Sequence, residues 1–164
     1  MSPDLTAARL DEIVHDSTLS IDDKIQALLQ LGLETFQLGL GIISHVDRRD
    51  YRVDYVAPPS AGLLPGTYFS LARTYCDITL KLRYTLAIDN MGTSAHKAHP
   101  CYTDFKLETY FGTPLIVNGE IYGTLNFTAP QSRGASFSPE DKAQLELLGQ
   151  AVASLIAQRT TLTV

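Results

Sequence analysis

The chain has 164 residues, a length that fits one domain with a sizeable buried core. Its hydrophobic fraction of 45% and charged fraction of 19% exclude a disordered acidic chain. The net charge of -5, with thirteen scattered Lys and Arg residues, argues against nucleic acid as a partner, because phosphate binding needs a basic face. No apolar run is long enough to cross a bilayer, so we expect no membrane insertion.

The start of the chain lacks the pattern of a secretory signal. Met1 is followed by Ser2, Pro3 and Asp4, without the basic and apolar segments that such a signal needs. We therefore expect a cytoplasmic protein. In that compartment its two cysteines are reduced thiols more often than a structural disulfide.

The first forty residues predict two helices. Residues 5–14 have a weak apolar stripe at helical spacing, and we expect residues 1–19 to form a helical arm. Ser20, with Asp23 three residues later, predicts a capping box. The apolar face that follows predicts an amphipathic helix that ends at Gly39.

Strands and an irregular segment follow. Residues 40–46 form an apolar strand pattern, and the alternation over 51–55 predicts a half-buried second strand. Residues 57–66 are rich in Pro and Gly and predict a loop. Residues 67–69 predict a short strand, after which Ser70 is expected to cap a helix.

The second half predicts a hairpin after a long excursion. Residues 85–88 form a strand pattern, whereas 89–105 have little periodicity and predict a long loop of the kind that often carries function. Asn118-Gly119 is the strongest local signal, because this pair suits a two-residue turn with positive φ between strands 109–117 and 120–128. A final amphipathic helix begins after Ser138 and Pro139.

The two faces of the predicted hairpin differ in chemistry. With Asn118 and Gly119 in the turn, opposite residues such as Phe111 and Asn126 share a face. The face expected to contact the first and last helices carries Tyr110, Ile116, Ile121, Leu125 and Phe127. The polar and aromatic face carries Thr109, Phe111, Thr113, Leu115, Val117, Glu120, Tyr122, Thr124, Asn126 and Thr128.

The polar face fits both a solvated surface and the wall of a pocket. The long excursion from Ala57 to Phe105 has only this face left to cover. A covered polar face predicts a wet or ligand-filled cavity.

Four short sequence motifs resemble those of the GAF domain family and occur in the same order as in that family. They are Gly112-Thr113-Pro114-Leu115, Asn118-Gly119, Gly123-Thr124-Leu125-Asn126-Phe127 and Phe137-Ser138-Pro139-Glu140-Asp141. The resemblance runs from Ile21 to Gln158. A narrower resemblance, to GAF domains of bacterial multidomain sensor kinases, rests on Thr74-Tyr75-Cys76, His99-Pro100-Cys101-Tyr102 and Leu107-Glu108-Thr109-Tyr110.

The resemblance implies an α/β fold of the α+β type for residues 20–164. It has a central antiparallel sheet of five to six strands, terminal helices on one face, and loops and short helices over a pocket on the other. It implies a regulatory domain that binds a small molecule or senses redox state. Its helices 21–38 and 140–158 are expected to form a homodimer and to signal to an attached or partner output domain, such as a histidine kinase.

Family membership does not name a cofactor, because relatives bind cyclic nucleotides, bilins, haem and other ligands. The Asn-Lys-Phe-Asp-Glu signature of the cyclic-nucleotide binders is missing. We predict no catalytic residue, and any kinase activity would belong to another domain. The residues expected to line the pocket are Tyr75, Cys76, His99, Cys101, Tyr102, Phe111, Thr124 and Asn126.

The two cysteines have several open interpretations. They are buried hydrophobes, or a reversible thiol pair in which His99 favours a thiolate at Cys101. A metal site would add His96 and His99 to Cys76 and Cys101, although that spacing matches no standard finger. A bilin thioether at Cys101 would lack the usual Cys-His pair. At the level of function, the alternatives are a thiol-dependent reductase of the free methionine sulfoxide type and a dimerisation module without ligand.

Overall fold

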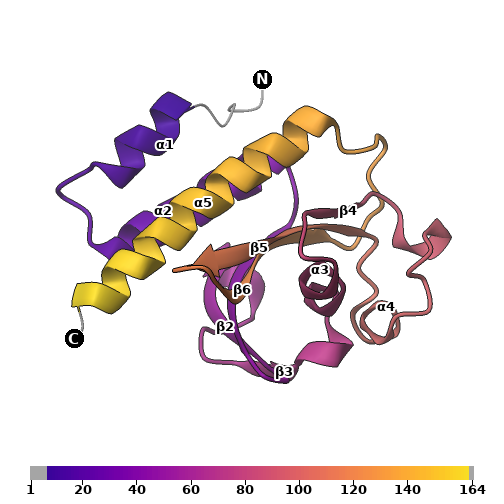
Figure 1. Cartoon of the computed structure of the whole chain (residues 1–164). Helices are drawn as coiled ribbons and strands as arrows, with labels where there is room; N and C mark the ends of the chain where they lie inside the picture. Colours follow the sequence, from indigo (N-terminus) through magenta and orange to yellow (C-terminus); the bar gives the residue numbers. More distant parts are fainter. Residues whose placement is uncertain (1–6, 163–164) are drawn as a thin grey trace.

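The described part of the chain folds into a six-stranded antiparallel sheet with helices on both faces (Figure 1). The structure is a computed structural model and describes residues 7–162, with only the backbone of residues 60, 103 and 162. Three helices cover one face: α1 (Ala7–Val14), α2 (Ile21–Phe36) and α5 (Pro139–Leu162). The short helices α3 (Cys76–Leu82) and α4 (Pro100–Phe105) lie over the other face. This arrangement confirms the predicted α+β fold.

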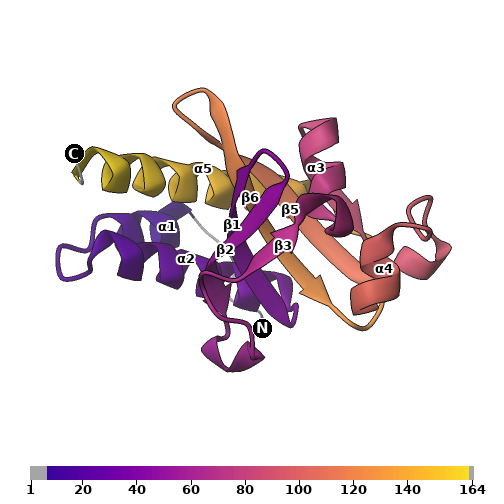
Figure 2. The same ribbon diagram turned by 90° about the horizontal axis from the view of Figure 1, so that it is seen from below.

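The strand order is β3-β2-β1-β6-β5-β4, so the two shortest strands form the edges (Figure 2). The hairpin strands β5 and β6 lie next to β1 and β4. The bounds are β1 Leu40–Asp47, β2 Asp50–Ala57, β3 Tyr68–Ser70, β4 Leu86–Ile88, β5 Thr109–Val117 and β6 Glu120–Ala129. Three short 3-10 helices lie in the connections: η1 (Pro59–Ala61), η2 (Leu71–Arg73) and η3 (Met91–Thr93).

Helix α2 begins as predicted but ends earlier. The Ser20 side chain accepts a hydrogen bond from the backbone N–H of Asp23 at 3.1 Å, which confirms the cap. Gln37, not Gly39, ends the helix in a left-handed conformation, with φ of 56°. Gly39 donates its backbone N–H to Thr128 at 3.0 Å and so already belongs to the sheet.

The helix expected after Ser70 is divided in two. Ser70 makes no side-chain cap, and η2 ends where Thr74 takes an extended conformation. The Thr74 hydroxyl donates to the carbonyl of Leu71 at 2.8 Å, which gives that carbonyl a side-chain partner. The long excursion expected to be a loop likewise contains η3 and α4.

The hairpin turn forms at Asn118 and Gly119, with φ values of 52° and 81°. A β-bulge changes the predicted register, because Leu115 pairs with Gly123 while Ile116 pairs with Ile121. Tyr122 is the extra residue of the bulge, and beyond it every pairing moves by one position.

The bulge inverts the predicted facing of β5. Phe111 pairs with Phe127 rather than Asn126 and belongs to the helix-side core, whereas Tyr110 belongs to the opposite core. Leu125 and Phe127 face the helices as predicted. The β5 residues moved to the helix side with Phe111 are Thr109, Thr113, Leu115 and Val117, and Ile116 moves to the other face with Tyr110.

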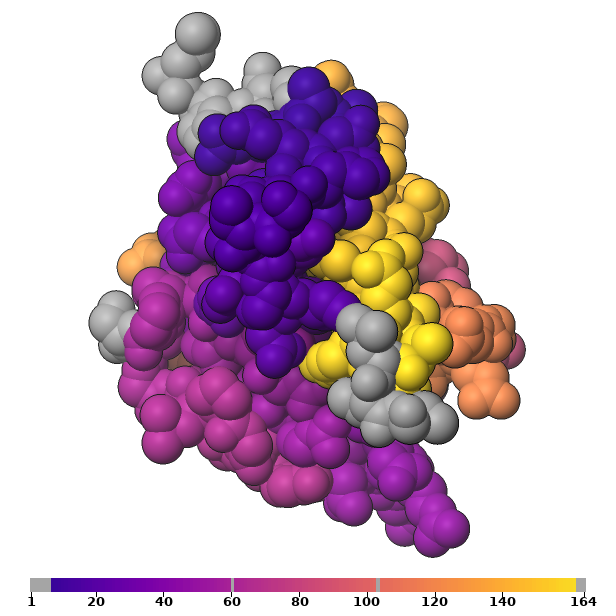
Figure 3. Space-filling model, turned by 90° about the vertical axis from the view of Figure 1, so that its left-hand side faces the viewer, coloured from indigo at the N-terminus to yellow at the C-terminus, as the bar shows by residue number. Residues whose placement is uncertain are grey.

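Helix α1 packs against α2 and α5 on the outer side of the helical layer (Figure 3). Its Leu10 is buried in the helix-side core, and Ile13 and Val14 pack against that core. The first two residues of the predicted arm helix, Leu5 and Thr6, lie outside the described residues. In the part of the chain that is described, no helix combines the length and the apolar character that a membrane span requires.

Candidate functional site

A cavity of about 250 Å³ lies between the second face of the sheet and the segments that cover it. Strands β1, β2, β5 and β6 form its floor, and α3, α4 and the loop before β3 form its walls. The lining residues are Leu40, Ile42, Tyr51, Leu63, Phe69, Thr74, Tyr75, Cys76, Cys101, Phe105, Leu107, Tyr110, Asn126 and Thr128.

The cavity is closed at its floor and less buried at one side. Tyr51, Tyr110 and Cys76 are almost fully buried. Phe69 of β3 and Phe105 of α4 are more exposed, and their rings meet edge to face with centroids 5.7 Å apart. These two rings mark the side of the cavity nearest to solvent.

A buried polar network surrounds Cys76. Its Sγ lies 3.2 Å from the Thr124 hydroxyl, 3.4 Å from Asn126 Oδ1 and 3.5 Å from the Tyr110 hydroxyl. The Thr124 hydroxyl also contacts Asn126 Oδ1 at 3.1 Å and the Ser44 hydroxyl at 2.8 Å. These contacts fix the Cys76 thiol against the floor of the cavity.

The network around Cys76 is neutral at physiological pH. Burial raises the pKa of Cys76, and burial raises the pKa values of Tyr51 and Tyr110 well above their usual range. Cys76 is therefore a thiol that both donates and accepts hydrogen bonds, rather than a thiolate.

Thr128 is a buried polar residue of the cavity wall. Only 3% of this residue is exposed, and its side chain lines the cavity. Among the described residues, its hydroxyl is the one fully buried side-chain nitrogen or oxygen without a hydrogen-bond partner. Native proteins pair nearly all such groups, so an unpaired hydroxyl in a cavity indicates a missing partner.

Cys101 lines the same cavity as Cys76, but His99 does not activate it. The Nδ1 atom of His99 accepts a hydrogen bond from the backbone N–H of Cys101 at 3.0 Å and so caps α4. Burial lowers the pKa of His99 and raises the pKa of Cys101 to about 12. The structure therefore gives no support to a Cys101 thiolate assisted by His99.

The structure brings four of the eight predicted pocket residues to the cavity wall: Tyr75, Cys76, Cys101 and Asn126. Thr124 lies behind Cys76 in its polar network.

His99 and Tyr102 lie outside the lining. The His99 ring is 5.5 Å from that of Tyr75, and the Tyr102 hydroxyl donates to Glu108 at 2.5 Å. The prediction that Phe111 lines the pocket is wrong. Its ring stacks on that of Phe137 in the helix-side core, with the ring centroids 4.1 Å apart.

Tyr51, Tyr110 and Thr128 line the cavity but were missing from the predicted pocket residues. The alternation over 51–55 marks Tyr51 as half-buried without giving the covered face. Tyr110 was placed on the wrong face because the bulge was not predicted. Thr128 was on the predicted polar face, but nothing in the sequence distinguishes its hydroxyl from those of its neighbours.

The metal alternative has no support in the geometry. Within residues 7–162, no three His, Cys, Asp or Glu side chains come together in a group suited to hold a metal ion. His96 and His99 therefore do not form a ligand set with Cys76 and Cys101.

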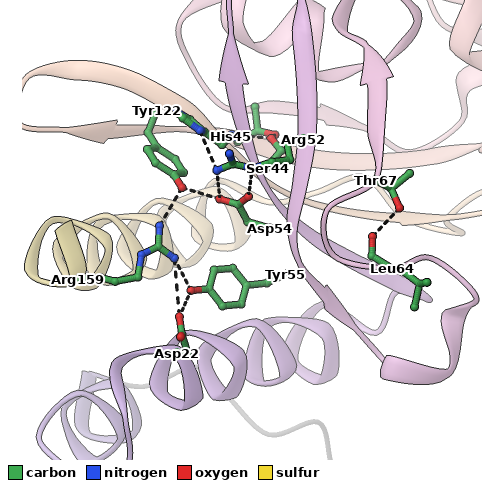
Figure 4. Close-up of polar contacts among 11 residues, drawn as sticks. Asp22, Ser44, His45, Arg52, Asp54, Tyr55, Leu64, Thr67, Tyr122 and Arg159 are labelled. Carbon is green, nitrogen blue, oxygen red and sulfur yellow. Dashed lines mark hydrogen bonds and ion pairs between the residues drawn. The ribbon is translucent and has the colours of Figure 1, made fainter. Parts of the chain in front are cut away.

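A second polar group, the Arg159 cluster, joins the sheet to the terminal helices (Figure 4). It consists of Asp22, His45, Arg52, Asp54, Tyr55, Tyr122 and Arg159. Arg159 of α5 donates to the hydroxyls of Tyr122 at 3.0 Å and Tyr55 at 2.5 Å, and Tyr55 donates to Asp22 of α2.

Hydrogen bonds and an ion pair also join the members of the Arg159 cluster that lie on the strands. The Tyr122 hydroxyl donates to Asp54 at 2.5 Å, and Asp54 pairs with Arg52 at 2.7 Å. Arg52 contacts His45 at 3.0 Å, and the His45 ring stacks on Tyr122 at 4.1 Å. Burial and the charge of Arg52 lower the pKa of His45, so this imidazole is neutral at pH 7. The bulge at Tyr122 directs its side chain toward α5.

A family model of the GAF domain matches residues 18–157, and the chain belongs to this family. Among solved structures, it is similar to the GAF domain of an Acinetobacter phosphoenolpyruvate-protein phosphotransferase. The two share 13% identity over 95% of this chain and 93% of that one, with a TM-score of 0.77.

Two further solved structures have the same fold. Free methionine-R-sulfoxide reductase from Neisseria meningitidis is 15% identical over 94% of this chain and 88% of its own, with a TM-score of 0.71. The chromophore binding domain of Stigmatella aurantiaca phytochrome P1 is 14% identical over 92% of this chain and 58% of its own, with a TM-score of 0.72. No curated protein matches the chain.

Proposed function

We propose that this GAF domain is a regulatory sensory module that binds a small molecule in the cavity beside Thr128 and transmits occupancy to its terminal helices. The unpaired Thr128 hydroxyl carries this proposal. A buried hydroxyl without a partner costs about 1–3 kcal/mol, and a bound ligand that pairs with it removes that cost. A concave, largely apolar cavity with a small number of polar groups is typical of ligand sites.

The transmission part of the proposal rests on two strands that reach both sites. Strand β2 places Tyr51 in the cavity and Tyr55 in the Arg159 cluster, and β6 likewise places Asn126 and Tyr122. A ligand that favours one position of these strands also favours one arrangement of Arg159. This route leads from the cavity to α2 and α5.

We further propose the biological setting implied by the sequence. The chain resembles GAF domains of bacterial sensor kinases, and we propose a cytoplasmic homodimer formed through α2 and α5 that acts on a histidine kinase or another output domain. The division into an arm, residues 1–19, and a GAF domain, residues 20–164, belongs to the same proposal.

We favour ligand binding over redox or reductase chemistry. The reductase alternative has a solved relative of the same fold, but thiol chemistry requires an accessible thiolate. Burial raises the pKa of both Cys76 and Cys101. A dimerisation module without ligand would not account for the cavity or for the unpaired Thr128 hydroxyl.

A cavity-filling variant tests the binding proposal. The purified protein is screened by NMR against a library of neutral, anionic and cationic fragments, with the amides of Asn126 and Thr128 as reporters. We expect saturable shifts in the wild type and their loss in Leu107→Trp, whose ring would fill the cavity. Leu82→Trp, on an exposed position of α3, is the matched control and should retain them. The proposal fails if no fragment shifts these amides, or if Leu107→Trp binds as well as Leu82→Trp.

A further inference from the structure

We propose that the cavity selects an uncharged, mainly apolar ring compound that carries one hydrogen-bonding group, and that this group pairs with the Thr128 hydroxyl. This inference rests on the proposed function, since it names the class of ligand that the same cavity takes.

The lining excludes ions. None of the lining residues is Asp, Glu, Lys, Arg or His. Arg73 and Asp104, on the segments that cover the cavity, pair with each other at 2.8 Å and are not among the lining residues. An anion or cation would leave water without gaining a partner of opposite charge, which costs more than the burial of its apolar part returns.

One fully buried polar atom of the lining residues has no partner. Asn126 Oδ1 accepts from the hydroxyl of Tyr51 at 3.4 Å, and the Tyr110 hydroxyl is paired with Thr79 at 2.8 Å. The Tyr75 hydroxyl donates to the carbonyl of Leu107 at 3.1 Å. Thr128 Oγ1 alone, among the fully buried side-chain polar atoms that are described, has no partner. A ligand with one hydroxyl, carbonyl or amine-like group of no net charge satisfies it.

The size of the cavity and its aromatic wall favour a ring compound. Aromatic side chains form much of the wall, among them Tyr51, Tyr75 and Phe69. An apolar cavity of roughly 150 Å³ accepts benzene, so one of about 250 Å³ has room for a ring with a few substituents.

A set of para-methyl compounds tests the ligand class directly. Toluene, p-cresol, 4-methylbenzoate and 4-methylbenzylamine share one ring and differ in the polar group and its charge. Each is titrated into the wild type at pH 7, with the amides of Asn126 and Thr128 as NMR reporters. We expect p-cresol to bind about 3–10 times more tightly than toluene, as one net hydrogen bond provides. Both charged compounds should bind at least about tenfold more weakly than p-cresol.

Thr128→Val tests the role of the hydroxyl. This variant should reduce the ratio of p-cresol to toluene affinity to about one and leave toluene binding unchanged, because valine keeps the shape and loses the oxygen. Thr113→Val, a buried threonine on the opposite face of the sheet, is the matched control and should keep the wild-type ratio. Well-dispersed spectra show that both variants are folded.

The outcomes separate this inference from the proposed function. The ligand class is overturned, with the proposed function intact, if 4-methylbenzoate or 4-methylbenzylamine shifts the cavity amides as readily as p-cresol. It is equally overturned if p-cresol and toluene bind alike, or if Thr128→Val keeps their ratio. If none of the four compounds and no library fragment shifts these amides, both proposals fail.

Discussion

Single residues around the cavity divide into paired and unpaired polar groups. The side chains around Cys76 satisfy one another through short contacts between neutral groups. Thr128 lies on the same strand as Thr124, four residues further along, yet its hydroxyl has no partner. This contrast between two threonines of one strand face is the basis for placing a ligand at Thr128.

The unpaired hydroxyl predicts a stabilising substitution. In ligand-free protein, Thr128→Val should raise the free energy of unfolding by about 1 kcal/mol, because it removes a buried polar group that has no partner. Urea unfolding at pH 7 measures this change. Thr113→Val should instead lower the free energy of unfolding, since the Thr113 hydroxyl contacts that of Thr85 at 3.0 Å. A loss of stability in Thr128→Val would show that the hydroxyl is paired in the native protein.

The cysteines are predicted to be unreactive in the folded state. A Cys101 pKa of about 12 leaves roughly a thousandfold less thiolate at pH 8 than an unperturbed thiol would have. Iodoacetamide labelling followed by mass spectrometry should therefore be far slower in native protein than in urea. Rapid native labelling of Cys101 at pH 8 would restore the redox interpretation.

The same raised pKa makes stability depend on pH in a defined direction. The folded state favours the neutral Cys101 thiol, so its contribution is complete below about pH 8.5 and is lost as the pH rises toward the folded value of about 12. Urea midpoints at pH 8 and 10.5 should fall less in Cys101→Ala than in the wild type. An equal or larger fall in the variant would contradict this assignment.

At the scale of elements, the Asn118-Gly119 turn was predictable because its positive φ values depend on two adjacent residues. The bulge at Tyr122 was not, since it follows from contacts with Arg159 and Asp54 that lie far away in the sequence. One extra residue inverted the facing of β5. The same limit explains the divided helix after Ser70, where local capping chemistry was outweighed by the placement of Tyr75 and Cys76 against the sheet.

Close approach of β1 and β6 predicts a position that only glycine fits. A Cβ atom at Gly123 would lie 1.9 Å from the carbonyl oxygen of Ser44, a backbone atom that cannot move without breaking the strand pair. Gly123→Ala should lower the free energy of unfolding by about 3 kcal/mol or more. Gly134→Ala, where a Cβ meets no atom within 4 Å, should change it by less than about 0.5 kcal/mol. Similar unfolding midpoints for the two variants would contradict the predicted spacing of these strands.

At the scale of the whole molecule, the sheet separates two cores and connects two polar sites. The sequence predicted the layers, because the apolar faces of α2, α5 and β6 are visible as periodic patterns. It did not reveal the Arg159 cluster, whose members come from both terminal helices and three strands (Figure 4). Such a cluster exists only after folding, and no local pattern marks its members.

The Arg159 cluster predicts that binding and transmission can be separated. Arg159→Met keeps the stem of the side chain and loses its hydrogen bonds to Tyr55 and Tyr122. We expect this variant to bind p-cresol within about twofold of the wild type, because Arg159 does not line the cavity. Arg133→Met, which removes a cation from the loop before α5 that pairs with Asp141 at 3.5 Å, is the control. A large loss of p-cresol affinity in Arg159→Met alone would show that the cluster builds the cavity rather than reports on it.

Hydrogen–deuterium exchange with and without saturating p-cresol follows the cavity and the terminal helices in one experiment, so it shows whether ligand binding in the cavity reaches α5. In the wild type and in Arg133→Met, we expect p-cresol to change exchange at Tyr110 and Thr128 and also in the C-terminal half of α5, by at least about twofold. In Arg159→Met, the change should remain at the cavity strands. Exchange in α5 that does not respond to p-cresol in the wild type, while exchange in the cavity strands does, would show that the cavity does not signal to the terminal helices.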